Sequence, residues 1–570
     1  MFRASNQNVG ADILSHYGRI VLLILFTLGC SSNNTPPTED NVLAQINDHS
    51  VSVVHFENAF KEYFYRTGQV LTPTETTKKA ILDSEFNTYV LAVFAEDIGL
   101  NNTAEAEYQR GAIRKRVLTE EFFKQVILDE VEVTDADLRE YFIRFNSNLR
   151  ASHIYAQTKE IADEYYTRIQ KGESFEDLAK EAFTNTYLSQ NGGDIGRFTT
   201  DDLDISFENQ AFSMNVGDIS MPIQTAQGYS IIKLTDRVTR PLITENEFNQ
   251  SRDRLESYVW KKKEEMAQRS HLQNFTEQAV LDEQVVQSLF GVISTSGEGL
   301  YNKNPEFISR LEVDGEILKY DDFVFGYKQL TEELLISSVA MLNTIRDEIS
   351  FKNFLLGIAY RSFMVEQVEE LGIDQQPAVI ASIEETYLHY LEELATQYLA
   401  SSISNTPAEL FSTFNLKRDD FYEPASIHVQ RLVVKGEETA EKLSKELKEG
   451  ADFSKFVLDY SIYNEDLFTE GDLGFIPLDD FGFNSRKISN IEIGSITEPM
   501  LYTADEYHIY KVIDRREARE LSFDEARERV DNYLIREKLQ QIRQQTIQEV
   551  KAKHNAVVDL EKLNALTIKI

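Results

Sequence analysis

The feature that most constrains the fold of this chain is an internal duplication at a fixed spacing. Residues 151–236 are repeated as residues 429–514, and Asp194 matches Asp472 at an offset of 278 residues. A constant offset across otherwise dissimilar sequence is typical of a duplicated structural unit. The chain is therefore expected to contain two copies of one plan.

The duplication extends to both sides of these central segments. Each copy begins with a strand, a turn and a second strand, and continues with two long stretches that have apolar residues at helical spacing. The strand pair and the two helical stretches are residues 44–51, 75–98 and 104–128 in the first copy, and 311–318, 343–371 and 377–400 in the second. A helix returns after each central segment, where Phe248 matches Phe523 at an offset of 275. The pattern predicts an α+β fold with small antiparallel sheets embedded in mainly helical domains.

Composition and charge narrow the class of function. The hydrophobic content of 42% and charged content of 27% are those of a folded, soluble protein. A net charge of −37 argues against nucleic acid as a partner, because phosphates would be repelled. The single cysteine excludes an internal disulfide and a cysteine-rich metal site. His49 and His55 have no carboxylate at a zinc-protease spacing, so neither a metal nor a cofactor is expected.

The N-terminal residues are typical of an export signal. An apolar run over residues 20–29 follows Arg19 and ends directly before Cys30. The run has the length of a signal-peptide hydrophobic region and is too short to span a bilayer comfortably. Gly29, Cys30 and the serines after them resemble a bacterial lipoprotein cleavage site, although Thr27 stands where leucine is usual. The alternative is a plain signal peptide with an incidental cysteine.

A lipoprotein signal would place the mature chain outside the cytoplasm. Residues 31–40 are rich in Ser, Asn, Thr and Pro and are predicted to form a flexible tether. We therefore expect lipidation at Cys30 and a periplasmic protein anchored to a bacterial membrane, with the outer membrane favoured.

Both central segments carry motifs that resemble parvulin-type peptidyl-prolyl isomerase domains. The motifs are Ser152-His153-Ile154, Gly192-Gly193-Asp194 and Gly228-Tyr229-Ser230 in the first, and Gly471-Asp472-Leu473-Gly474 and Tyr507-His508-Ile509 in the second. The order of elements over residues 42–559 is similar to that of the SurA, PrsA and PpiD class of exported folding factors. In that class a helical chaperone domain is assembled from sequence on both sides of a parvulin domain. Here each parvulin has its own flanks, so the chain resembles a fused dimer of PrsA-like units.

The resemblance and the repeat together predict eight segments. They are a signal peptide (1–29), a lipidated tether (30–41), a helical chaperone-like domain (42–148), parvulin-like domain 1 (149–240), a returning helix and linker (241–308), a second helical domain (309–425), parvulin-like domain 2 (426–517) and a C-terminal helix and tail (518–570).

The resemblance assigns roles to residues of the first domain. Rotation about an Xaa-Pro bond meets a barrier of roughly 20 kcal/mol and needs an apolar proline pocket with a few polar groups, but no metal or nucleophile. The family's first-strand histidine corresponds to His153, and its second histidine is replaced by Ser230. Its Cys or Asp position corresponds to Asn185 by ungapped counting, or to Thr186 if the preceding aromatic residue is aligned instead. The proline-pocket positions are Leu203, Phe207 and Phe212.

The second domain departs further from the family pattern. Arg431 stands at the first histidine, Tyr463 at the Cys or Asp position and Phe481 at the Met position, whereas His508 retains the second histidine. No clear pocket phenylalanine follows Phe481. We therefore expect this domain to be inactive, serving a structural or peptide-binding role.

Three functions remain open at this level. The first is a lipid-anchored peptidyl-prolyl isomerase and chaperone that acts on Xaa-Pro segments of unfolded or nascent exported proteins through domain 1. The second is a non-catalytic holdase that uses degenerate parvulin domains to bind peptides. The third, a structural lipoprotein scaffold, predicts no affinity for unfolded chains.

Overall fold

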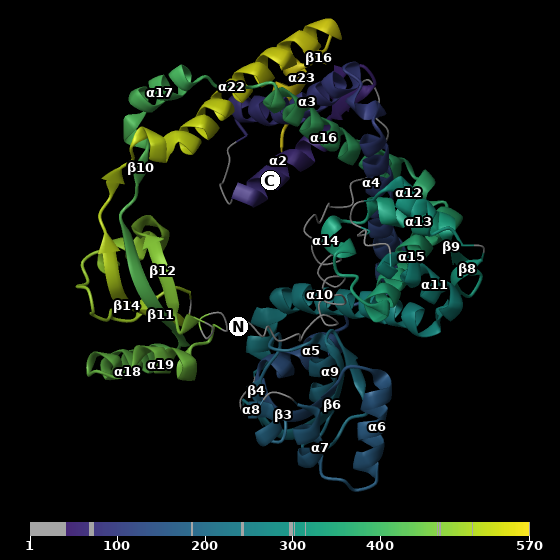
Figure 1. Ribbon diagram of the computed structural model, residues 1–570, viewed down its shortest axis with the longest axis vertical. Helices are drawn as coiled ribbons and strands as arrows, with labels where there is room; N and C mark the ends of the chain where they lie inside the picture. Colours follow the sequence, from purple (N-terminus) through teal and green to yellow (C-terminus); the bar gives the residue numbers. More distant parts are fainter. Residues whose placement is uncertain are drawn as a thin grey trace. The chain divides into compact units, whose positions relative to one another are not determined.

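The computed structural model describes residues 41–67, 73–183, 186–240, 244–295, 300, 303–313, 315–463, 466, 469–503 and 505–568 (Figure 1). They divide into two compact units. Residues up to 393, together with those from 554 onward, belong to the first unit, and residues 394–553 form the second. The expected lipidation site Cys30, the tether over 31–40 and Asn185 lie outside the described residues.

The first unit begins with a β-hairpin and long helices. These are β1 (Val42–Ile46), β2 (His49–Ser52), α2 (Val53–Thr67), α3 (Glu75–Asp97), α4 (Ala104–Phe122) and α5 (Asp135–Phe145). Thr74 and Thr103 begin α3 and α4, because their side chains accept hydrogen bonds from the first-turn amides. Gly99 separates the two helices with a φ of 79°, which glycine adopts without a side-chain clash. The break therefore falls where the sequence predicts it.

A four-stranded antiparallel sheet with helices on both faces follows. In spatial order its strands are β4 (Asp194–Phe198), β3 (Ser147–Ala156), β6 (Gly228–Thr239) and β5 (Ile223–Thr225), with α6 (Lys159–Gln170), α7 (Phe175–Ala182), α8 (Thr186–Gln190) and α9 (Ile205–Ser213). Ile154 of β3 packs with Leu178 of α7, whereas Leu149 packs with Phe207 of α9. Because strand residues alternate between faces, α7 and α9 lie on opposite sides of the sheet.

The remainder of the first unit repeats the hairpin and the helices. Its elements are α10 (Glu245–Gln278), β7 (Val280–Leu281), α11 (Glu283–Thr295), α12 (Pro305–Ser309), β8 (Glu316–Tyr320), β9 (Phe323–Gly326), α13 (Tyr327–Ile336), α14 (Val339–Leu342), α15 (Glu348–Glu370), the first part of α16 (Pro377–Ser401), β16 (Val557–Val558) and α23 (Leu560–Ala565). The hairpin expected over 311–318 was placed too early, since its strands span 316–326. Its turn residue Asp321 has a φ of 47°, like Asn47 at 48° in the first hairpin, and short polar side chains tolerate this conformation.

The third strand of each hairpin sheet comes from the other copy. In the first sheet β16, at the end of the second copy, pairs with β1, so that Val558 lies opposite Ala44. In the second sheet β7, at the end of the first copy, pairs with β8, so that Leu281 lies opposite Leu318. The two registers are equivalent, so each copy supplies the third strand of the other copy's hairpin sheet.

The second unit contains a sheet of the same design. In spatial order its strands are β12 (Asp472–Pro477), β11 (Ser426–Lys435), β14 (Glu506–Arg516) and β13 (Met500–Leu501), accompanied by the end of α16, α17 (Pro407–Leu416), β10 (Tyr422–Glu423), α18 (Glu437–Lys448), α19 (Phe453–Tyr460), η8 (Leu478–Asn484), α21 (Ser485–Ile488), β15 (Arg519–Glu520) and α22 (Phe523–Lys553). Leu432 packs with Phe453 of α19, and Val429 packs with Phe481. Small antiparallel sheets thus occupy both central segments of a mainly helical chain, which confirms the α+β prediction.

No helix of the described residues combines the length and the apolar character that crossing a bilayer requires.

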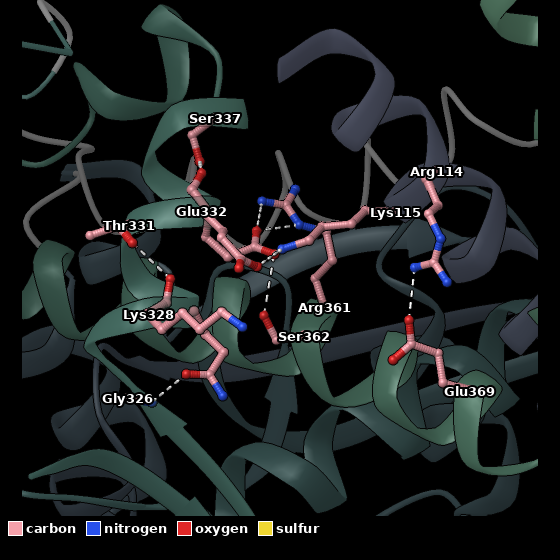
Figure 2. Close-up of polar contacts among 12 residues, drawn as sticks. Arg114, Lys115, Gly326, Lys328, Thr331, Glu332, Ser337, Arg361, Ser362 and Glu369 are labelled. Carbon is pink, nitrogen blue, oxygen red and sulfur yellow. Dashed lines mark hydrogen bonds and ion pairs between the residues drawn. The ribbon is translucent and has the colours of Figure 1, made fainter. Parts of the chain in front are cut away.

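A buried carboxylate joins the two copies inside the first unit. Glu333 of α13 is fully buried, and its Oε1 lies 2.8 Å from Lys115 Nζ of α4. Ser362 Oγ donates a hydrogen bond of 3.2 Å to the same oxygen, and Arg361 Nε donates one of 2.6 Å to Oε2. Figure 2 shows Lys115, Arg361 and Ser362 converging on one point from two helices. Removing one member of such a buried pair leaves the others uncompensated.

We predict that Glu333→Gln lowers the free energy of unfolding by about 3 kcal/mol, because Lys115 and Arg361 would lose their shared counter-charge. Glu332→Gln is the matched control, since its half-exposed carboxylate lies 3.3 Å from the same lysine and should contribute less than about 1 kcal/mol. Urea unfolding followed by the fluorescence of Trp260, the single tryptophan, measures both. Equal losses in the two variants would contradict the role of the buried carboxylate.

Candidate active site

His153 lies on the central strand β3, where the backbone fixes its position. Its amide donates a hydrogen bond of 2.9 Å to the carbonyl of Gly193, which has a φ of 76°. A Cβ at Gly193 would lie 2.2 Å from the carbonyl oxygen of His153. Only glycine allows this approach, so the Gly-Gly-Asp motif serves to seat the strand that carries His153.

The imidazole of His153 lies between aromatic rings and next to Ser230. The Nδ1 atom is 3.4 Å from Ser230 Oγ, and the ring centroid lies 5.1 Å from that of Phe183 and 5.6 Å from that of Phe207. Ser230 is buried. Burial lowers the pKa of His153 from its ordinary 6.5 to about 4. The ring is therefore neutral near pH 7, and it can donate or accept a hydrogen bond without bringing a charge into an apolar site.

The structure brings the three predicted pocket residues into one apolar cluster. Phe207 is buried on α9, and Leu203 and Phe212 pack partly buried against the same core. Phe207 contacts the His153 ring, whereas Phe212 lies beneath the guanidinium of Arg144, with 5.2 Å from Cζ to the ring centroid. Phe207 therefore lies beside His153, Leu203 lies in the same cluster, and Phe212 supports the far end of α9.

Two predicted polar side chains of the site lie outside the part that the structure describes, and one polar residue near the site was not predicted. Asn185 lies outside the described residues, as does the side chain of its alternative Thr186. Tyr155 was not anticipated; it stands opposite Ser230 in the strand pairing and donates a hydrogen bond of 2.7 Å to the carbonyl of Gln227. Its place two residues after His153 on one strand, and hence on the same face, was the available signal.

The equivalent position of the second domain is filled by an ion pair. Arg431 Nη2 lies 2.6 Å from Oδ1 of Asp466, whose side chain is buried, and Ser461 Oγ donates a hydrogen bond of 3.1 Å to the other carboxylate oxygen. The Arg431 guanidinium also lies 5.0 Å from the centre of the Tyr463 ring. The backbone is unchanged, because the Arg431 amide donates to the Gly471 carbonyl at 2.8 Å.

The two copies carry different residues at the position of Asp466, the partner of Arg431. The Gly193 amide donates to the carbonyl of Leu188, and the Gly471 amide donates to that of Asp466, both at 2.8 Å. The second copy therefore has aspartate where the first has leucine. The buried Asp466 carboxylate needs a counter-charge, and the partly buried Arg431 supplies it.

His508, the retained histidine of the second domain, is engaged on both nitrogens. Its Nε2 lies 2.8 Å from Glu506 Oε1, and its Nδ1 lies 2.9 Å from Tyr510 Oη. Tyr463 donates a hydrogen bond of 2.8 Å to the same Glu506 oxygen, and Tyr502 stacks on the imidazole at 4.1 Å. Burial lowers the pKa of His508, and Glu506 partly opposes this shift. Phe481 is buried against Tyr510 rather than facing an open pocket.

Comparison with known proteins identifies both domains. The family model of the PPIC-type peptidyl-prolyl isomerase domain matches residues 143–236, and a second model of the same description matches residues 406–528. The chain therefore contains two PPIC-type peptidyl-prolyl isomerase domains.

Relatives with curated names match parts of this chain. The foldase protein PrsA of Bacillus subtilis is 34% identical over 160 residues, which cover 28% of this chain and 54% of that protein. The foldase protein PrsA of a Geobacillus species is 28% identical over 247 residues, 42% of this chain and 86% of that protein. The chain thus spans about half the length of the first relative.

Solved structures give the same kind of match. A structure reported for SurA-like chaperones of Campylobacter jejuni is 18% identical, covering 37% of this chain and 86% of that chain with a TM-score of 0.21. The crystal structure of PrsA from Bacillus subtilis is 24% identical, covering 46% and 82% with a TM-score of 0.16.

Within the described ranges, no group of three or more His, Cys, Asp or Glu side chains could hold an ion. His55 instead lies between Glu85 and Glu385, at 3.1 and 3.3 Å, a pairing that its sequence neighbours did not indicate.

We predict that His153 titrates with a midpoint near pH 4 in nuclear magnetic resonance spectra of the folded chain. Phe207→Ala should move the midpoint toward the ordinary 6.5, because it admits water to the imidazole. Since the unfolded chain binds this proton at higher pH, the contribution of His153 to stability should fall as the pH drops from 6.5 toward 4. A midpoint near 6.5 in the unmodified chain would show that the ring is solvated.

Proposed function

We propose that this chain is an exported folding factor that isomerises Xaa-Pro bonds through its first parvulin domain and binds unfolded exported proteins. The observation that carries the proposal is the neutral, partly buried imidazole of His153 between Phe183 and Phe207. An apolar cleft with neutral polar groups is what desolvation and twisting of a prolyl amide require. Slow prolyl isomerisation limits the folding of many chains, so such a catalyst has a substrate wherever exported proteins fold.

The second domain serves as a non-catalytic module in this proposal. Arg431 and Asp466 form an ion pair beside the Tyr463 ring, and the Tyr463 hydroxyl donates to Glu506, so the polar atoms at this position are already paired. A site that is already satisfied internally gains little by admitting a peptide. Catalysis is therefore assigned to domain 1, with the Ser230 hydroxyl in the place of a second histidine.

A holdase without isomerase activity is the second candidate. It is favoured by Ser230, which replaces one histidine of the family pattern, and by the large apolar side chains exposed on the helices. Among those of the first unit are Tyr65, Ile349 and Leu371, which are 80, 67 and 61% exposed. Exposed apolar residues on a helical frame suit transient binding of unfolded chains.

We predict that His153→Ala lowers kcat/KM for short Xaa-Pro peptides on the order of tenfold to hundredfold, because a positioned hydrogen-bonding group is lost from the cleft. His508→Ala is the matched control and should leave the rate unchanged, as its domain is assigned no catalysis. The measurement is a coupled peptide assay with residues 31–570, beside suppression of aggregation of an unfolded protein. Suppression without any isomerisation would support the holdase instead.

The proposal places the protein at a bacterial membrane through a lipid on Cys30, with the outer membrane favoured. We predict that Cys30→Ser moves the chain from the membrane fraction to the soluble extracytoplasmic fraction and abolishes incorporation of labelled fatty acid, because the thiol that carries the lipid is gone. Ser31→Ala should retain both properties. Fractionation of cells after metabolic labelling measures this, and continued membrane association of Cys30→Ser would contradict lipid anchoring.

A further inference from the structure

Helix α9 carries the proline pocket on one face and meets the helical region on the other. Phe207 and Ala211 point to the sheet core. Asn209 faces α10 instead, where its Nδ2 donates to the sulfur of Met266 at 3.2 Å. The pocket helix is thus clamped between its own sheet and a helix that belongs to the chaperone-like part of the chain.

Arg269 of α10 is the central contact at this junction. Its Nη1 donates hydrogen bonds of 2.9 and 2.8 Å to the two carboxylate oxygens of Asp204, and one of 3.1 Å to Ser206 Oγ. Lys262, two turns earlier on α10, lies 2.7 Å from Asp201 in the loop before α9. Residues seven apart share one face of a helix, so both cations reach the same edge of the parvulin domain.

Asp204 in turn joins two segments that border the cleft. Its Oδ1 accepts the Ser206 amide at 2.9 Å, which caps α9, and its Oδ2 accepts the Ala226 amide at 3.1 Å in the turn between β5 and β6. Leu203 precedes this carboxylate and Phe207 follows it by one helical turn. Ser230 lies four residues after Ala226. One carboxylate therefore links both sides of the site around His153.

The second copy lacks both members of this pair. At the offsets of the duplication, Asp204 corresponds to Gly482 and Arg269 to Gln544. The same copy has the internally filled site of Arg431 and Asp466. The Asp204–Arg269 contact is thus present in the copy to which catalysis is assigned, and its equivalent is missing from the other.

We infer that Arg269 is a positioning residue of the first parvulin domain, which holds α9 and the β5–β6 turn at the spacing that an Xaa-Pro peptide requires. It acts through Asp204 and touches neither the peptide nor His153. This inference rests on the proposed function of domain 1, and it adds that the helical region sets the geometry of the isomerase pocket.

The test is Arg269→Met in the full chain. The expected result is a rise in KM for an Xaa-Pro peptide, and in the Kd of that peptide by titration, of about tenfold, with a smaller change in kcat because His153 stays in place. Arg252→Met is the matched control, since this arginine of the same helix pairs with Asp135 at 2.8 Å, away from the sheet. Arg269→Lys keeps one ion pair and should restore part of the loss.

Amide hydrogen exchange at Ser206 and Ala226 separates this inference from the proposed function. Faster exchange at both amides in Arg269→Met but not in Arg252→Met supports positioning, even if the unmodified chain shows no isomerisation and the proposed catalysis fails. Unchanged KM, Kd and exchange in Arg269→Met would overturn the inference while leaving the isomerase proposal intact. An equal effect of Arg252→Met would also overturn it, because the loss would then be a general loosening of α10.

Discussion

The first unit depends on a strand exchange between the two copies, in which β16 pairs with β1 and β7 pairs with β8. A two-stranded hairpin is marginally stable in water, and a third strand is needed to build a sheet. The amides of Asp559 and Asp282 donate to the carbonyls of Leu43 and Ile317, at 2.8 and 3.1 Å, and both aspartates then cap the helix that follows. Neither copy therefore completes its own hairpin sheet, and the first unit is built from strands of both copies.

Side-chain packing reinforces this exchange. Phe122 of α4, in the first copy, belongs to the same apolar core as Phe354 of α15, in the second, and Phe275 of α10 lies in that core too. The buried Glu333 carboxylate bridges α4 to α15 through Lys115 and Arg361. Apolar contact supplies most of the free energy of folding. The charges determine which helices pair, because an unpaired buried charge costs roughly several kcal/mol of stability.

On this frame the two parvulin sites have the same backbone and different chemistry. The glycine that seats the central strand is present in both copies, since any Cβ would collide with the facing carbonyl. These features follow from local sequence, so the sheets, the helix breaks and the place of His153 could be predicted. The ion pairs could not, because Glu333 lies 218 residues from Lys115 and Asp204 lies 65 from Arg269, and no periodicity links such partners. The second hairpin was misplaced because Gly315 offered a turn signal that Asp321 satisfies instead.

The long helix α10 contacts α5, the first parvulin domain and the second hairpin in turn. In its first half Leu255 and Val259 pack against α5, in its second half Arg269 donates to Asp204 of the first parvulin domain, and near its end Phe275 is buried with the second hairpin. A helix of 34 residues spans about 50 Å and bends little without a proline or a glycine inside it. A displacement of the chaperone-like core would therefore reach Asp204 through one rigid element. Under the proposed function, this connection would link binding of an unfolded chain to the shape of the proposed prolyl pocket.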